Sequence, residues 1–472
     1  MTKQIKNRLP TRLRIAAGMQ AELLCAGRFV SGRDKKNILA EDLGFHPLFR
    51  YFRKKSGGRA RTVKSAFLAP GLFQKKAVFI DGLGAVLLNG IPEKRVRSWD
   101  PDLPGPRPVR PEIIPWPAGD LLPTSSSSGP VDKAKLDAAV EAAFAEPDPR
   151  RPRRTRAVVV VHDGRIVAER YAPGFHKDMP QLGWSMSKCV INALIGILVG
   201  RGDLDVLASA PVPEWRSSGD PRRAITIDQL LRMSSGLAWT QDDPDHAVSD
   251  ESKMLFGQAD MAAFAAARPL RYAPDTVFEY SSGTSLLLSR IVRQTIGDQA
   301  AYWAFPRRAL FNRIGMRGAI FQPDASGTFV GSSYVYATAR DWARFGLLYL
   351  NDGVWEGEKI LPEGWVDYTR TPSPTAGNGE YGAHFRLNGA AVALPEKRMF
   401  PRLPPDAFFC RGYQGQLTAI IPSRRLVAVR LGLTWDSEWG GDDFLAAVLA
   451  AVEPSSAGTA DRQTLIKENP GR

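Results

Sequence analysis

Cysteine is scarce in this chain of 472 residues, which contains only Cys25, Cys189 and Cys410. Three cysteines without a Cys-x-x-Cys pair exclude a disulfide framework and a cysteine-based metal site. The five histidines are single and lack metal-ligand spacing, so we expect neither a metal nor an organic cofactor. Long apolar runs are also missing, because the longest, residues 189–200, is shorter than the ~20 residues of a membrane-spanning helix.

Acidic residues are few at the front of the chain. Residues 1–110 hold 23 Lys and Arg against 8 Asp and Glu, a charge of +15, whereas the remainder is nearly neutral at −1. This segment also contains an expected amphipathic helix over residues 13–30. An anionic membrane surface is therefore a candidate partner of residues 1–110, the alternative being a solvated basic surface. Nucleic acid is not expected, because no recognised binding motif accompanies the charge.

Proline marks the expected domain boundary. Nine of the 36 prolines lie in residues 101–130, together with a run of four serines, a composition typical of an extended linker. We therefore predict a basic N-terminal extension (1–100), this linker (101–130), a main domain (131–454) and a disordered tail (455–472). No clear signal peptide is present, which favours a cytoplasmic protein or one held peripherally at a membrane. The oligomeric state stays open.

The main domain contains expected helices and strands in separate stretches of the chain. Helical spacing over residues 132–146 is followed by a hairpin pattern in which Asp163-Gly164 separates the strand-like runs 157–161 and 165–171. A helix is expected over about residues 185–200, and helical signals dominate from residue 226 to about residue 349. Strand-like runs return at 417–421 and 426–431 before a last helix near 443–452. Strands from both ends around a helical middle predict an α+β fold with an antiparallel sheet.

A Ser-x-x-Lys motif carries the strongest chemical signal. Ser185 and Lys188 lie at the start of an expected helix, where positions three apart share a face, so the amine of Lys188 can reach the hydroxyl of Ser185. The helix N-terminus adds free N–H groups beside that serine. This pair is chemically sufficient for acyl transfer, the alternative being a helix-capping serine and a solvated lysine.

Two further segments fit the same chemistry. Tyr280 lies in a turn-rich loop just before another helix, and its phenol could move the proton of the serine, although it could equally pack against that helix. Residues 412–416 precede a strand, and their glycines would let a substrate carbonyl approach the backbone. Together with the N–H of Ser185, N–H groups at the start of this strand could form an oxyanion hole.

In this order, these elements resemble the motifs of the serine β-lactamase and penicillin-recognising superfamily: Ser-x-x-Lys, then Tyr-x-Asn or Ser-x-Asn, then Lys-Thr-Gly. Residues 225–237 and 337–346 also look like the family, and the resemblance covers about 131–454. Within the superfamily, the chain looks most like class C-like esterases and 6-aminohexanoate-dimer hydrolases. The resemblance implies an antiparallel sheet flanked by terminal helices, with a mostly helical subdomain.

The resemblance also implies roles for individual residues. Ser185 would be the acylated nucleophile, Lys188 its activating partner and Tyr280 the proton relay, while the N–H groups of Ser185 and Gln416 would hold the oxyanion. The substrate-binding residues implied are Trp184, Ser282, Tyr413 and Gly415.

Two positions depart from the family pattern. Ser282 stands where Asn is usual, which weakens any hydrogen bond to a substrate amide. Tyr413-Gln414-Gly415 stands where Lys-Thr-Gly would be, so the cation that meets a β-lactam carboxylate is missing. The loss of a charge-assisted hydrogen bond, roughly 1.5 to 3 kcal/mol, argues against antibiotic recognition.

The sequence therefore predicts a serine hydrolase that cleaves a small ester or amide through an acyl-enzyme. One alternative is a β-lactamase or D-Ala-D-Ala carboxypeptidase. The other is a non-catalytic binding or envelope scaffold, which the presence of Ser185, Lys188 and Tyr280 disfavours.

Overall fold

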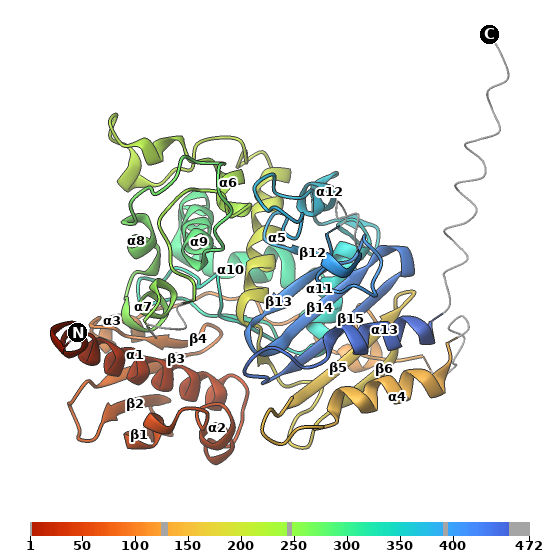
Figure 1. Ribbon diagram of the computed structural model, residues 1–472, viewed down its shortest axis with the longest axis horizontal. Coiled ribbons are helices and arrows are strands. Elements are labelled where there is room, and N and C mark those ends of the chain that lie inside the picture. Colours follow the sequence, from red (N-terminus) through yellow and green to blue (C-terminus); the bar gives the residue numbers. More distant parts are fainter. Residues whose placement is uncertain (1, 124–130, 243–247, 390–394, 453–472) are drawn as a thin grey trace, which may run out of the picture.

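The computed structural model describes residues 2–123, 131–242, 248–389 and 395–452. It shows an N-terminal domain packed beside a larger domain (Figure 1). The expected disordered tail (455–472) and the serine run of the predicted linker lie outside the described residues.

The N-terminal domain is a long helix laid across a small antiparallel sheet. Helix α1 (Thr2–Phe29) extends beyond the predicted helix 13–30, and α2 (Lys35–Glu41) follows it. The four strands lie in chain order across the sheet: β1 (Phe52–Gly57), β2 (Thr62–Phe67), β3 (Lys75–Ile80) and β4 (Gly84–Leu87). The residues expected to be basic surface thus form a folded domain whose apolar side chains are buried partly in a cluster shared with the larger domain. The short helix α3 (Glu93–Arg97) follows, and its Val96 is buried in the main core.

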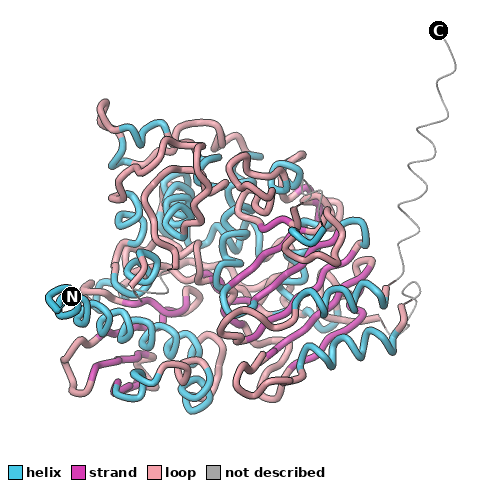
Figure 2. Tube along the Cα trace, viewed as in Figure 1, coloured by secondary structure: helices cyan, strands magenta, loops and turns pink. Residues whose placement is uncertain are grey.

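The larger domain is built on a six-stranded antiparallel sheet of order β12-β13-β14-β15-β5-β6. Its strands are β5 (Thr155–His162), β6 (Arg165–Tyr171), β12 (Arg386–Leu387), β13 (Phe408–Gly412), β14 (Gln416–Ile421) and β15 (Leu426–Gly432). Helices α4 (Lys133–Phe144) and α13 (Gly441–Ala451) cover one face and α11 (Ala339–Leu350) covers the other (Figures 1 and 2). Strands from both ends of the domain share one sheet, so the predicted α+β architecture is confirmed.

Local sequence signals explain several of these elements. Asp163 and Gly164 both have positive φ, +47° and +75°, as a tight hairpin turn between right-twisted strands requires. Helices α11 and α6 (Ile227–Leu231) begin with capping boxes at Thr338 and Thr226, where the cap side chain accepts from the third backbone N–H of the helix. In β5, Val158 and Val160 pack toward α4 and α13, while the alternate residues face the main core.

The helical subdomain lies beside the sheet and above the N-terminal domain in Figure 1. Its helices besides α6 are α5 (Ser187–Gly200), α7 (Asp250–Gly257), α8 (Met261–Ala266), α9 (Ser282–Ile296) and α10 (Gln299–Pro306). A second, three-stranded sheet of order β7-β9-β8 joins residues 181–182, 335–337 and 320–321. Further short elements are β10 (Val354–Trp355), β11 (Glu358–Lys359) and α12 (Trp365–Arg370).

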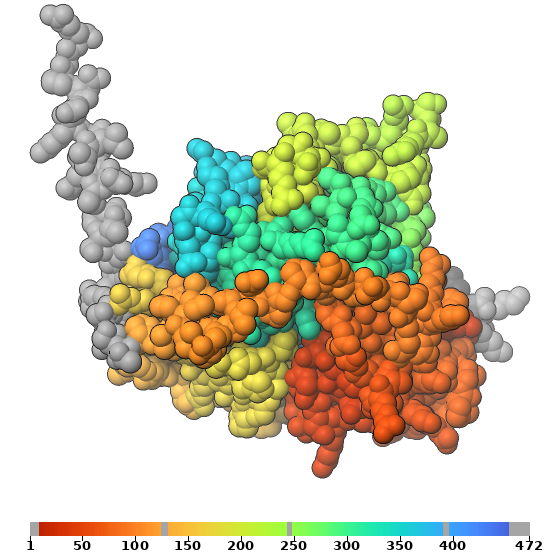
Figure 3. Space-filling view, turned by 180° about the vertical axis from the view of Figure 1, so that it is seen from behind, coloured from red at the N-terminus to blue at the C-terminus, as the bar shows by residue number. Residues whose placement is uncertain are grey.

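Residues 101–123 of the predicted linker form a strap fastened to the larger domain. Figure 3 shows the strap in orange, running across the back of the molecule. The side chain of Asn312 accepts from Arg107 N at 3.1 Å and donates to Gly105 O at 2.8 Å. Arg344 donates to Pro117 O and Gly119 O, and the indole of Trp116 is buried in the main core. The strap contains a 3-10 turn at Pro111–Ile113 and is held to the larger domain by specific hydrogen bonds.

The two domains meet through both charged and buried contacts. Arg156 of β5 donates to Glu41 and Asp42 at the end of α2, at 2.9 and 3.0 Å, and Arg33 binds the same carboxylates. On α1, Glu22 is buried, and the amide of Gln322 in the larger domain donates to its Oε1 at 3.1 Å. Its Oε2 lacks a hydrogen-bond partner among the described residues. Burial raises the pKa of Glu22 to about 8, so this carboxyl is best accommodated in its protonated form.

None of the described helices is both long and apolar enough to cross a bilayer. The expected association of residues 1–110 with anionic lipid stays a prediction.

The buried carboxyl of Glu22 predicts a pH-dependent stability. Its folded pKa of about 8 exceeds the ordinary 4.5, so its contribution is fully present below pH 4.5 and is lost as the pH rises through 8. We expect the free energy of unfolding to fall by on the order of 3 kcal/mol more between pH 5 and pH 8 in the wild type than in Glu22→Gln. Urea unfolding at both pH values measures this difference.

The control is Glu141→Gln, because that carboxylate is exposed and pairs with Arg170. An equal loss of stability in the wild type and in Glu22→Gln would show that Glu22 is ionised in the folded protein.

Candidate active site

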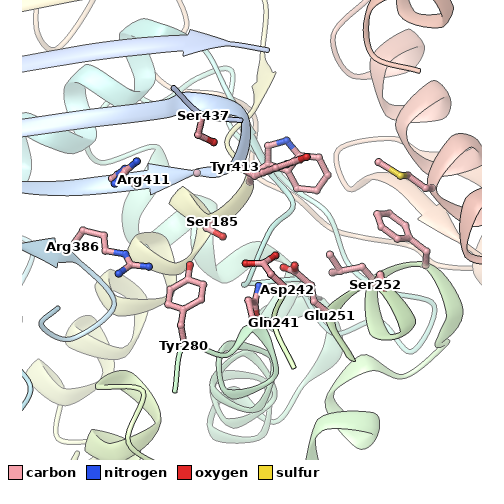
Figure 4. Close-up of a pocket in the computed structure, with 15 residues that line it drawn as sticks. Ser185, Gln241, Asp242, Glu251, Ser252, Tyr280, Arg386, Arg411, Tyr413 and Ser437 are labelled. Carbon is pink, nitrogen blue, oxygen red and sulfur yellow. The ribbon is translucent and has the colours of Figure 1, made fainter. Parts of the chain in front are cut away.

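A cavity of about 440 Å³ lies where the sheet, the helical subdomain and the N-terminal domain meet. Figure 4 shows Ser185 near its centre, with Tyr280 and Arg386 on one side and Ser252 of α7 on the other. The cavity is lined by Met19, Trp184, Ser185, Gln241, Asp242, Glu251, Ser252, Leu255, Phe256, Tyr280, Arg386, Arg411, Gly412, Tyr413 and Ser437.

Ser185 lies in a strained turn that leads into α5. Its neighbour Trp184 has φ +47°, a left-handed conformation that is unfavourable for a bulky residue. The side chain of Ser187 holds this turn, because its hydroxyl donates to Trp184 O at 2.7 Å and accepts from Val335 N at 2.9 Å. Strain of this kind persists only where the surroundings enforce it, and it commonly marks a functional site.

The end of strand β13 approaches this turn through backbone contact. A Cβ on Gly412 would lie 2.1 Å from Gly183 O, and a Cβ on Gly183 would lie 2.6 Å from the ring of Trp342. Both positions therefore require glycine for close approach. Tyr413, which follows Gly412, is thereby placed beside the turn that carries Ser185.

Lys188 is buried with an exposed fraction of 1% and has three hydrogen-bond partners. Its Nζ lies 3.1 Å from Ser185 Oγ, 3.2 Å from Ser282 Oγ and 3.0 Å from Ser332 O. A buried amine needs such partners, because its desolvation is otherwise strongly unfavourable. The helical spacing of Ser185 and Lys188 brings the two groups together as the sequence predicts.

Tyr280 extends from the loop before α9, and its hydroxyl points toward Ser185 (Figure 4). The centroid of its ring lies 4.9 Å from Lys188 Nζ and 4.8 Å from Arg386 Cζ. The ring of Tyr381 packs edge-on against it at 5.8 Å. These contacts fix the orientation of the phenol between the amine of Lys188 and the guanidinium of Arg386.

Ser282 is fully buried and contacts protein groups rather than the cavity. Its hydroxyl donates to Glu251 Oε1 at 2.8 Å and accepts from Gln241 Nε2 at 2.9 Å as well as from Lys188. Its backbone N–H donates to Gln241 Oε1 at 2.8 Å. The sequence predicts that Ser282 contacts the substrate. The structure instead connects Ser282 to Lys188 and Glu251.

Glu251 on α7 is a site residue that the sequence analysis does not identify. Burial raises the pKa of its carboxyl, and the nearby charge of Lys188 counteracts this effect. No local motif marks Glu251 or Gln241, because both come to Ser282 from more than thirty residues away in the chain.

His384 is a buried structural residue. Its Nδ1 lies 3.0 Å from Lys188 O, which can only accept, so Nδ1 carries the proton and Nε2 accepts from Ser285 Oγ at 3.2 Å. Burial, together with the charge of Lys188, lowers the pKa of His384 to about 3 and keeps the ring neutral. It ties the start of α5 to α9 and does not line the cavity.

Two of the residues expected in the substrate site lie elsewhere. Gln416 borders a neighbouring small cavity, and its side-chain amide pairs with Gly432, donating to the carbonyl at 2.6 Å and accepting from the N–H at 3.0 Å. Gly415 packs against Arg430 and Trp439 at φ +77°. The predicted oxyanion donor Gln416 and substrate contact Gly415 are thus not brought to the cavity, whereas Trp184 and Tyr413 are.

The cavity contains cations that the sequence analysis expects to be missing. Arg386 and Arg411 both line it, from the neighbouring strands β12 and β13. Arg411 donates to Met399 Sδ at 3.2 Å, and Arg386 lies 3.9 Å from Glu380. Burial, together with the charge of Arg386, lowers the pKa of Arg411. The loss of the family lysine therefore does not leave this wall without positive charge.

Among the described residues, no group of three or more His, Cys, Asp and Glu side chains is arranged to hold a metal ion. The three cysteines are buried and free.

Comparison with known proteins adds an independent finding. A family model described as Beta-lactamase matches residues 138–451. A 6-aminohexanoate-dimer hydrolase from Paenarthrobacter ureafaciens is 28% identical over 226 residues, covering 45% of this chain and 56% of that protein. The chain thus spans little more than half the length of this relative.

Solved structures show the same fold at low identity. A structure described as a putative 6-aminohexanoate-dimer hydrolase from Bacillus anthracis has a TM-score of 0.52 and 22% identity, covering 68% of this chain and 81% of that one. A family VIII carboxylesterase also has a TM-score of 0.52, with 16% identity over 68% of this chain and 96% of that one. Since the family model spans well over half of the residues and the fold agrees, the chain belongs to the beta-lactamase family.

Proposed function

We propose that this protein is a serine hydrolase that cleaves a small ester or amide through an acyl-enzyme on Ser185. The observation that carries the proposal is the buried amine of Lys188, 3.1 Å from the hydroxyl of Ser185, in a cavity large enough for a small molecule. A buried amine and a strained turn both destabilise the fold, so their presence beside an accessible serine favours a catalytic role over that of a scaffold.

The partners of Lys188 direct its lone pair. Ser332 O can only accept, so it takes one N–H of the amine. Ser282 gives its own hydroxyl proton to Glu251, so it also accepts from Lys188. In the unprotonated amine both N–H bonds are then engaged, and the lone pair is left for Ser185. Lys188 is thereby oriented as the general base for the nucleophile.

The reaction then follows from these positions. Ser185 Oγ attacks the carbonyl carbon while its proton passes to Lys188, and the carbonyl oxygen becomes an oxyanion. When the C–O or C–N bond breaks, the leaving group takes a proton from Tyr280, which is restored from Lys188. A water molecule attacks the acyl-enzyme, its proton passes to the same pair, and Ser185 is released with its hydroxyl proton returned.

For the oxyanion we propose the N–H groups of Ser185 and Tyr413. Gly412, the last residue of β13, approaches the backbone of Gly183 closely, which sets the residue that follows the strand, Tyr413, beside Ser185. Tyr413 also lines the cavity, whereas Gln416 does not. Two N–H groups converging from a helix start and a strand end are the arrangement that stabilises a tetrahedral oxyanion.

A second candidate substrate is an amide or ester whose leaving group carries a carboxylate, which includes β-lactam-like and D-alanyl compounds. It rests on Arg386 and Arg411, which line the cavity on the side of Tyr280, where the leaving group would depart. Guanidinium groups pair well with carboxylates.

The nucleophile is tested directly by substitution. We expect Ser185→Ala to abolish hydrolysis of p-nitrophenyl acetate and labelling by a fluorophosphonate, because no oxygen remains to form the acyl-enzyme. The control is Ser217→Ala, at an exposed serine. If Ser185→Ala kept more than a tenth of the wild-type rate, the proposal would be wrong.

Substitution of the groups that transfer protons should lower kcat without abolishing hydrolysis. Lys188→Ala and Tyr280→Phe should each lower kcat by about 10²- to 10⁴-fold, the usual contribution of a positioned acid or base. Ser282→Ala should also lower kcat, because Lys188 loses the acceptor that orients its amine. Stopped-flow acylation and steady-state rates measure this. Unchanged kcat in Tyr280→Phe would remove the phenol from the mechanism.

The second candidate predicts charge selectivity. Arg386→Gln should lower the preference for 4-acetoxybenzoate over phenyl acetate, measured as a ratio of kcat/KM, by about tenfold or more, because a charge-assisted hydrogen bond is lost. Arg150→Gln, at an exposed arginine, serves as the control. A wild-type enzyme without preference for the carboxylate would exclude this candidate.

A further inference from the structure

The N-terminal domain reaches the cavity around Ser185. Met19 of α1 lines this cavity beside Leu255 and Phe256 of α7. The matching family model covers residues 138–451, so Leu255 and Phe256 belong to the shared family region, whereas Met19 comes from outside it. A domain without an assigned role thus contributes a side chain to the candidate active site.

Close packing fixes the position of Met19. Its neighbour Gly18 touches α7, because a Cβ on Gly18 would lie 2.4 Å from Phe256 O and 3.2 Å from Leu87. Helix α1 is thereby held between α7 and its own sheet. Apolar side chains of α1 and α7 also share one buried cluster with Trp184. Met19 is therefore part of a rigid wall rather than of a loose appendage.

The direction of the leaving group identifies what this wall faces. Tyr280, the proposed proton donor to the leaving group, lies with Arg386 on one side of Ser185, and Ser252 of α7 lies on the other (Figure 4). The acyl portion of a substrate must extend away from the leaving group. It therefore points past the polar side chains of Asp242 and Glu251 toward α7 and α1, where Leu255, Phe256 and Met19 present apolar surface.

We propose that Met19, Leu255 and Phe256 form an acyl-chain subsite through which the N-terminal domain selects the length of the hydrocarbon chain in the substrate. The proposal rests on the proposed serine-hydrolase function. Each additional methylene buried in such a subsite is worth about fourfold in kcat/KM, the equivalent of ~0.8 kcal/mol, until the subsite is full.

The test is a chain-length profile with p-nitrophenyl acetate, butyrate, hexanoate and octanoate. We expect Met19→Trp to lower the octanoate-to-acetate ratio of kcat/KM by at least tenfold, because the indole fills the end of the subsite. Met19→Ala should shift the optimum to a longer chain. The matched control is Leu9→Trp, because Leu9 is 54% exposed on the same helix, and it should leave the profile unchanged.

Fluorophosphonate labelling of Ser185 separates this proposal from the proposed function. If labelling depends on Ser185 but both Met19 variants keep the wild-type profile, the subsite is disproved while the hydrolase stands. If the wild type is not labelled and cleaves no ester of the series, the proposed function fails, and the subsite fails with it. Equal losses at all chain lengths in both variants, with circular dichroism unchanged, would also overturn the subsite.

Discussion

The burial of one amine, that of Lys188, is the constraint on which the site depends. An amine away from water must be matched by acceptors, and its partners come from three separate segments: Ser185 before α5, Ser282 at the start of α9 and Ser332 before β9. Satisfying this single group therefore ties α5, α9 and the segment before β9 to one another. The same contacts that make the fold compatible with a buried amine also leave its lone pair to the nucleophile.

Local chemistry is what the sequence predicts well. The pairing of Ser185 with Lys188 follows from helical spacing, whereas Tyr280 is singled out by the resemblance of its segment to the family motif. The position of the oxyanion donor does not follow in this way. Gln414 has φ +63°, and this turn separates Gly412, which touches Gly183, from the strand that begins at Gln416. The sequence motif predicts Gln416, the first residue of the strand, as the oxyanion donor. The path of the backbone places Tyr413 at the cavity instead.

Charge in the cavity is a property of strand pairing rather than of a motif. Arg386 on β12 is paired with Phe409 on β13, and Phe409 is two residues before Arg411 on the same strand. Strand pairing thus brings together two arginines that are 25 positions apart in the chain. The sequence shows that the family lysine is missing but not that sheet register supplies two other cations. Glu251 and Gln241 are likewise brought to Ser282 only by the packing of α7 and of the preceding loop on α9.

For the N-terminal domain, too, composition does not predict how the domain contacts the rest of the protein. Its net charge of +15 describes its surface, whereas Gly18, Met19 and Glu22 on the inner face of α1 determine how it meets the larger domain. Because α1 packs closely against Phe256 of α7 and Leu87 of β4 at Gly18, a larger side chain at position 19, which lines the cavity, extends into it. The contact that stabilises the domain interface therefore also sets the shape of the site, so that interface stability and substrate selection are coupled in α1.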